Sequence, residues 1–291
     1  MTEAAIRQES NDEFTAFWNN VLVAKFERFR NIMLEGLSCH SRIPLSRLEL
    51  ARGSRALDVG CGWGDTAIEL AKKVGPSGFV LGLDCCDAFL AKGRRDAEAE
   101  GLAQLRFVVA DVQTHGFAPE FDFCFSRFGM MFFANPVAAM RNIRSALKPG
   151  SRLMFITWRA LAENPWMDVP KKIALEFLPP PGDDAQTCGP GPFSMANPDV
   201  VRAQLKSAGF VDAEFQAVDG DVMIGSSVEQ AVEFQLALGP AGEIVREAGA
   251  LAAERRPQIE AGLRAELARH RRDGEVWMRS GSWTITARNP A

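Results

Sequence analysis

The stretch "LDVGCGWGD" places three glycines at alternate positions, Gly60, Gly62 and Gly64, directly after an apolar run. Glycine is conformationally costly in regular structure, so this spacing indicates that a ligand approaches the backbone at a strand-to-helix junction. A dinucleotide fingerprint has the order G-x-G-x-x-G, and Asp65 stands where that order has its last glycine. A carboxylate beside a helix N-terminus also repels an incoming pyrophosphate. The junction therefore favours a ligand that carries positive charge over a nicotinamide dinucleotide.

Three aspartates, Asp58, Asp84 and Asp111, each stand at the end of a separate apolar run. The carboxyl ends of neighbouring parallel strands meet at the ligand-binding edge of an open α/β sheet, so we expect the three carboxylates to lie close together. At that edge Asp84 can accept hydrogen bonds from both hydroxyls of a ribose, and Asp111 can accept one from an adenine amino group. Together with the glycines, the aspartates predict a nucleotide-type site.

The elements that must position these residues follow a simple alternation. From residue 53 onward, short apolar runs alternate with helical segments, which is typical of a parallel sheet covered on both faces by helices. The apolar runs are residues 56–59, 79–83, 105–109, 121–125 and 153–158. The helical segments are residues 65–74, 87–100 and 135–147, and a Lys-Pro-Gly stop signal follows the last of them. The chain is therefore predicted to be an α/β protein.

Segments outside this alternation are predicted to form a cap and a lid. Apolar residues in 11–37, among them Phe17 and Trp18, recur every three or four positions, which predicts a helical cap that ends in a loop around Pro44. Residues 160–198 are rich in proline and glycine and predict a long irregular lid. The candidate substrate or lid residues are Phe17, Trp18, Trp158 and Trp166.

The α/β pattern resumes after the lid. We expect a helix at about 199–208, a strand at 210–218 and helices at 228–272 that Pro257 divides. The alternating β-branched residues of "GSWTITARN" predict a final strand that closes the sheet edge. The expected domains are a helical cap (1–52), a ligand-binding core (53–158), a lid insertion (159–198) and the rest of the sheet (199–291) with a helical insertion at about 225–274.

Composition limits which partners and which cellular location we expect for the protein. The 291 residues carry a net charge of −4, which gives no basic field for nucleic acid. The N-terminus lacks the apolar core of a signal peptide, and no run approaches the roughly 18 apolar residues of a membrane span, so we expect a cytoplasmic protein without a membrane span. The six cysteines have no C-x-x-C spacing, which predicts reduced packing residues and no metal site.

These motifs resemble those of the class I S-adenosylmethionine-dependent methyltransferases. "LDVGCGWG" is similar to their glycine-rich motif, "GLDCCDAFLAKGR" to their ribose-binding acidic motif and "VVADVQTHGF" to their adenine-binding motif. The resemblance covers about residues 50–160 well, and it implies a Rossmann-like, doubly wound, seven-stranded and mainly parallel sheet. Within that superfamily the chain looks most similar to bacterial small-molecule methyltransferases related to the ubiquinone and menaquinone C-methyltransferases.

The resemblance implies how the matching residues bind S-adenosylmethionine and its product S-adenosylhomocysteine. The three glycines would let the methionine moiety approach the backbone, Asp58 would face its ammonium group directly or through water, and Asp84 would bind the ribose. Asp111 and the backbone of Val112 would read the adenine edge. No metal ion is implied.

Residues after the second and fourth apolar runs complete the expected site. By the same resemblance, Cys85 would pack on the adenosine, and Ser126 and Arg127 would lie near the methyl group. Arg127 is interpreted either as a clamp for a substrate carboxylate or as part of a structural ion pair. His115 is interpreted as a loop contact rather than a base.

The function that these residues favour is methyl transfer to a small, apolar or amphipathic acceptor by in-line displacement. The sulfonium activates the methyl group, so no particular catalytic residue is required, and none is predicted. Two alternatives stay open: a catalytically silent, methyltransferase-like module that binds a nucleotide, and an NAD-dependent oxidoreductase. The motifs leave open the acceptor, the atom that is methylated (O, N, S or C) and whether the chain forms a homodimer.

Overall fold

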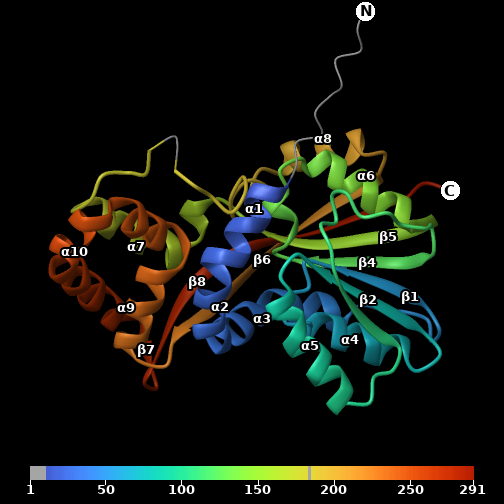
Figure 1. The fold of residues 1–291 in the computed structure, drawn as a ribbon, viewed down its shortest axis with the longest axis horizontal. Coiled ribbons are helices and arrows are strands. Elements are labelled where there is room, and N and C mark those ends of the chain that lie inside the picture. Colours follow the sequence, from blue (N-terminus) through green and yellow to red (C-terminus); the bar gives the residue numbers. More distant parts are fainter. Residues whose placement is uncertain (1–10, 183–184) are drawn as a thin grey trace, which may run out of the picture.

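The computed structural model describes residues 11–182 and 185–291, and one mixed sheet runs through the described chain (Figure 1). The strand order is β3-β2-β1-β4-β5-β8-β6, and the short β7 pairs with β8. Strands β1 to β5 are parallel, whereas β8 is antiparallel to its neighbours. The strands are β1 (Arg55–Val59), β2 (Phe79–Asp84), β3 (Leu105–Val109), β4 (Phe121–Arg127), β5 (Leu147–Trp158), β6 (Val211–Gly225), β7 (Arg271–Arg272) and β8 (Glu275–Arg288).

Helices cover both faces of the parallel part of the sheet (Figure 1). On one face lie α3 (Arg30–Ser46), α4 (Asp65–Val74) and α5 (Asp87–Ala99), and on the other lie α6 (Pro136–Ala146) and α8 (Pro198–Ser207). Because both faces are covered, strand residues such as Leu57 and Phe123 are buried. The predicted Rossmann-like α/β fold is confirmed.

Local sequence explains where the helices of this core begin. The backbone of Gly64 has a φ of 81°, a left-handed conformation that favours glycine, and it turns the chain from the glycine loop into α4. At the start of α6 the side chain of Asn135 accepts a hydrogen bond of 2.9 Å from the Ala138 N–H, and Pro136 occupies the first helical position. Gly64 and Asn135 thus set where α4 and α6 begin.

A second group of helices lies beyond the far ends of the long strands β6 and β8 (Figure 1). It consists of α7 (Pro165–Leu175), α9 (Val228–Ala237) and α10 (Gly239–Leu267). The N-terminal helices α1 (Asp12–Phe17) and α2 (Val23–Arg28), joined by a π-helical turn at Trp18–Leu22, lie between this group and the sheet. Within the described part of the chain, no helix combines the length and apolar character needed to cross a membrane.

The last strand differs from the prediction that it closes the sheet edge. Strand β8 lies between β5 and β6, pairing for example Ile285 with Phe155 on one side and with Phe215 on the other. The outer position belongs to β6, which is longer than the predicted strand at 210–218. Alternation of β-branched residues identifies a strand but does not choose its neighbours, because both inner and edge strands show that pattern.

Three features of the helical segments also differ from the prediction. The lid segment contains helix α7, and Pro44 lies inside α3 rather than in a loop. In the C-terminal insertion the helical backbone breaks at Gly249, with φ 52° and ψ −118°, whereas Pro257 lies inside the helix. Proline removes one helical hydrogen bond, and burial of apolar side chains around it can offset that loss. Ile259 and Leu263, which follow Pro257 in the same helix, are buried in this way.

Candidate functional site

A cavity of about 470 Å³ lies at the carboxyl ends of β1, β2, β3 and β4. One part of its wall is formed by backbone and polar side chains, from Gly60, Gly62, Asp84, Cys85, Asp111 and Val112. The other part is apolar and contains Trp158, Trp166, Phe193, Phe234 and Leu238. The predicted site residues Trp18 and Arg127 also line the cavity, whereas the predicted residues Phe17, Asp58, Gly64 and Ser126 are not among its lining residues.

The three glycines of the loop after β1 differ in what surrounds them. All three have a positive φ, of 63° at Gly60, 52° at Gly62 and 81° at Gly64. A Cβ added to Gly62 would meet nothing within 4 Å, because this glycine faces the cavity. A Cβ added to Gly64 would lie 2.6 Å from Cζ of Phe107. Gly64 therefore makes room for a packed aromatic ring.

The ring of Phe107 is confined by glycines. Cβ atoms added to Gly82 and Gly93 would lie 2.7 Å and 3.0 Å from the same ring, so it cannot move away from Gly64 in those directions. We expect Gly64→Ala to lower the free energy of unfolding by about 2–4 kcal/mol, because it adds overpacking to a left-handed φ, and Gly62→Ala to lower it by only about 1 kcal/mol. Urea unfolding of the two variants measures the difference, and equal losses would show that the ring is not confined.

Asp84 is held in one orientation at the end of β2. Its Oδ2 accepts a hydrogen bond of 2.9 Å from the Gly62 N–H, and its Oδ1 accepts one of 2.9 Å from the Cys86 N–H. Burial raises the pKa of this carboxyl, and the two backbone donors oppose that rise. Since a carboxylate oxygen has a further lone pair, Asp84 can still accept hydrogen bonds from a ligand in the cavity.

Asp111 at the end of β3 has a partner that the sequence pattern did not indicate. Its Oδ1 accepts hydrogen bonds from the Gln113 N–H at 2.9 Å and from Nδ2 of Asn11 at 3.4 Å. Asn11 lines the cavity, and its Oδ1 accepts a hydrogen bond of 3.1 Å from the Ala134 N–H. Asn11 stands just before α1, where no motif marks it, and a contact across 100 residues has no signal in local periodicity.

Asp58 and Ser126 are not among the residues that line the cavity. Both side chains are fully buried. Oδ2 of Asp58 accepts a hydrogen bond of 2.6 Å from Oγ1 of Thr66, and burial raises the pKa of Asp58 to about 7. Among the described residues, Oδ1 of Asp58 and Oγ of Ser126 have no hydrogen-bond partner.

The apolar part of the cavity is built from stacked aromatic rings. Trp158 stacks on Phe128 with ring centroids 3.9 Å apart and an interplanar angle of 15°, and it meets Trp166 edge to face at 5.4 Å. The backbone of Phe128 has a φ of 57°, which is uncommon for a bulky residue. Phe17, predicted as a substrate or lid residue, lies instead beneath the guanidinium of Arg246.

The N-terminal helices cover the cavity through contacts with distant segments. Nε1 of Trp18 donates a hydrogen bond of 3.1 Å to the carbonyl of Cys188, and Nδ2 of Asn19 donates one of 3.1 Å to the carbonyl of Cys85. Glu27 accepts a hydrogen bond from Nε1 of Trp63 in the glycine loop. The helical stripe predicted a cap, and the structure shows that this cap contacts both the glycine loop and the lid segment.

Comparison with known proteins shows which family this part of the chain resembles. Residues 50–178 match a family described as a methyltransferase domain. This segment is similar to class I S-adenosylmethionine-dependent methyltransferases. The predicted resemblance is therefore confirmed.

Two curated relatives and one solved structure show how far the likeness extends. Aklanonic acid methyltransferase of Streptomyces sp. strain C5 is 33% identical over 108 residues, which are 37% of this chain and 49% of that protein. Demethylmenaquinone methyltransferase of Staphylococcus carnosus is 27% identical over 61% of this chain and 76% of its own length. The chain thus spans about half the length of the first relative.

The solved structure is a phosphoethanolamine N-methyltransferase of Haemonchus contortus, determined with S-adenosylhomocysteine. It aligns with a TM-score of 0.52 and 17% identity over 98% of this chain and 59% of its own length. At this identity the likeness supports the fold alone.

Arg127, the arginine predicted for the site, is neutralised by Asp65. Nη2 of Arg127 donates to both carboxylate oxygens of Asp65 at 2.9 Å and 2.7 Å, and Nη1 donates to Oγ of Ser41 at 3.1 Å. Of the two interpretations of Arg127, the structure therefore contains the ion pair. It also explains Asp65, which stands where a dinucleotide fingerprint has glycine and here forms a bidentate pair with Arg127.

No histidine lines the cavity of the methyltransferase domain within residues 11–182 and 185–291. His40 is buried between Oγ of Ser280 at 2.7 Å and Oγ of Ser282 at 2.8 Å, and burial lowers its pKa to about 4. His115 packs edge to face on Phe117. The neutral imidazole of His40 is thus a structural hydrogen-bonding group rather than a proton acceptor for a substrate.

Proposed function

We propose that this chain transfers the methyl group of S-adenosylmethionine to an apolar small molecule. The observation that carries the proposal is the single cavity, whose glycine-lined, acidic part is continuous with an aromatic part. A cofactor in the first part would direct its sulfonium methyl group toward an acceptor in the second. The two relatives, named for the methylation of aklanonic acid and of demethylmenaquinone, support a small-molecule acceptor.

For the cofactor, we propose roles for the residues that line the polar part. Asp84 accepts from the ribose hydroxyls, for which its two backbone hydrogen bonds orient it. Asp111 and the backbone of Val112 lie at the end of the neighbouring strand and read the adenine edge. Gly60 and Gly62 allow the methionine moiety to contact the backbone, since a Cβ at Gly62 would point into open space.

In this proposal the protein catalyses the reaction by positioning the acceptor and the cofactor. The methyl group of a sulfonium is already activated, so the protein must hold acceptor, carbon and sulfur in line and exclude water. The stacked rings of Phe128 and Trp158, with Trp166 edge to face against Trp158, offer an apolar aromatic surface for the acceptor. Asp65 and Arg127, which both line the cavity, neutralise each other's charge in an ion pair.

Calorimetry tests the cofactor, and mass spectrometry tests the reaction. We expect the purified chain to bind S-adenosylhomocysteine and S-adenosylmethionine but not NAD. We also expect a mass increase of one methyl group in an apolar member of an acceptor panel. Binding of NAD alone would overturn the proposal. Cofactor binding without turnover on any acceptor would favour the catalytically silent module.

A further inference from the structure

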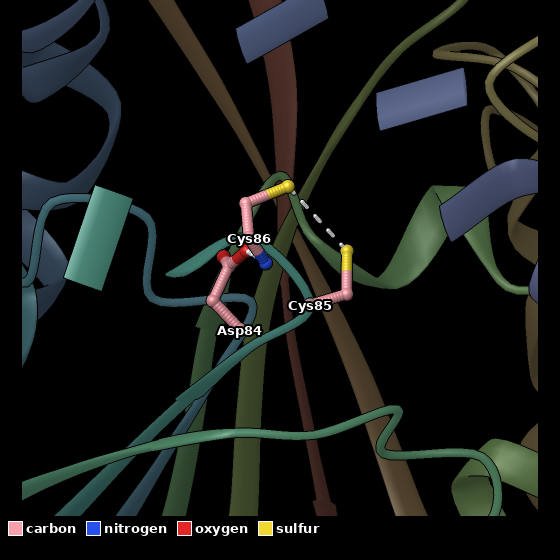
Figure 2. Close-up of side chains that lie close together, drawn as sticks. All are labelled: Asp84, Cys85 and Cys86. Carbon is pink, nitrogen blue, oxygen red and sulfur yellow. Dashed lines mark hydrogen bonds between the residues drawn. The ribbon is translucent and has the colours of Figure 1, made fainter. Parts of the chain in front are cut away.

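Three consecutive side chains, Asp84, Cys85 and Cys86, converge at the turn between β2 and α5 (Figure 2). The two sulfur atoms lie 3.8 Å apart and share a hydrogen bond. A carboxylate oxygen of Asp84 and both sulfur atoms all lie within 4.8 Å of one another. The spacing rule that predicted no metal site looks for pairs of cysteines two residues apart, and it does not consider adjacent ones.

The separation of the two sulfur atoms is the one that a tetrahedral metal requires. Thiolates bound to zinc at about 2.3 Å in tetrahedral geometry lie about 3.8 Å from each other. The side chains of Cys85 and Cys86 therefore need little rearrangement to bind one ion between them. A third ligand from the Asp84 carboxylate would leave one coordination position for water or another small ligand.

We propose that Asp84, Cys85 and Cys86 form a binding site for a soft or borderline divalent cation such as Zn²⁺ or Cd²⁺. On binding, each thiol releases its proton to solvent and each sulfur forms a bond to the ion. Two thiolates and one carboxylate balance more than the charge of the cation, and thiolates select such ions over Mg²⁺ or Ca²⁺.

The surroundings allow an ion to reach the site and hold the ligands in place. Asp84 and Cys85 line the cavity, so an ion can reach them through it, whereas the side chain of Cys86 is fully buried. Nδ2 of Asn19 donates to the carbonyl of Cys85, and the Cys86 N–H donates to Asp84. These hydrogen bonds hold the turn in the conformation in which the two sulfur atoms lie 3.8 Å apart.

The site overlaps the cofactor site, and this consequence rests on the proposed function. An ion that takes the Asp84 carboxylate withdraws the oxygen that would accept from the ribose. Cation and cofactor therefore compete, and by linkage each weakens the other by the same factor. The cation would act as a reversible inhibitor of methyl transfer.

Direct titration with Cd²⁺ tests the site without reference to the cofactor. We expect one Cd²⁺ per chain to produce the ultraviolet charge-transfer absorption of cadmium–thiolate bonds in reduced protein, with Zn²⁺ displacing it. Cys86→Ser and, separately, Cys85→Ser should remove most of this absorption. Cys39→Ser is the matched control, because Cys39 is a half-buried single thiol on α3 away from the cavity, and it should leave the signal unchanged. Equal signals in all four proteins would overturn the proposal.

Competition tests the overlap separately. We expect saturating Cd²⁺ to raise the dissociation constant of S-adenosylhomocysteine at least about 10-fold in the wild-type chain and less than about 2-fold in Cys86→Ser. Cadmium binding without competition would retain the metal site and contradict the role of Asp84 in cofactor binding. Failure to bind S-adenosylhomocysteine at all would contradict the proposed function while the absorption still decides the metal site.

Discussion

Replacing Asp84 by alanine is expected to raise the dissociation constant of S-adenosylhomocysteine about 10- to 100-fold, the range for loss of charged hydrogen bonds. The change removes the carboxylate proposed for the ribose and also the acceptor of the Gly62 and Cys86 N–H groups. Asp84→Asn should have a smaller effect, because its amide keeps one acceptor oxygen. Isothermal titration calorimetry measures all three affinities.

A nearby carboxylate provides the control for this prediction. Asp87 in the first turn of α5 is largely exposed, pairs with Arg94 and is not among the residues that line the cavity. Asp87→Ala should leave the dissociation constant within about twofold of the wild-type value, as expected of a surface pair. If Asp84→Ala binds as the wild-type chain does and remains folded, the ribose assignment is wrong.

The second large effect concerns Asp58 and the pH dependence of stability. Burial raises its pKa to about 7 in the folded chain, above the value of 3.8 for the free side chain. Because the folded state then holds the proton more tightly than the unfolded state, this carboxyl stabilises the fold at low pH. That contribution is lost as the pH rises toward 7. The full loss amounts to about 4 kcal/mol, on the order of 1.4 kcal/mol for each pH unit.

Asp58→Asn should remove this pH dependence, because the amide does not titrate. Urea unfolding between pH 5 and pH 8 is expected to show the wild-type chain losing stability relative to Asp58→Asn up to about pH 7, with no further change above it. Thr66→Val provides a second check, since the Thr66 hydrogen bond opposes the rise in the pKa of Asp58. In that variant the loss should extend to higher pH. Parallel curves for the wild-type chain and Asp58→Asn would refute the assignment.

Much of the core was predictable because its signals are local. The alternation of apolar runs and helices predicts parallel strands, and parallel strands bring their carboxyl ends to one edge of the sheet. Asp84 and Asp111 therefore had to lie near the glycine loop once the strands were assigned. Gly62 follows for the same reason, because a glycine directly after the first strand faces that edge.

The sequence by itself thus determined the class of fold, the glycine loop and the two cavity-lining aspartates. Only the tertiary structure decided that Gly64 receives Phe107, that Asp58 is buried behind the loop, and that Asn11 contacts Asp111. The tertiary structure also decided that β8 lies between β5 and β6 and that Phe128 stacks on Trp158. Periodicity reports which way a side chain points within its own helix or strand. Contacts between elements far apart in the chain depend on how these surfaces pack, and a linear pattern does not encode that packing.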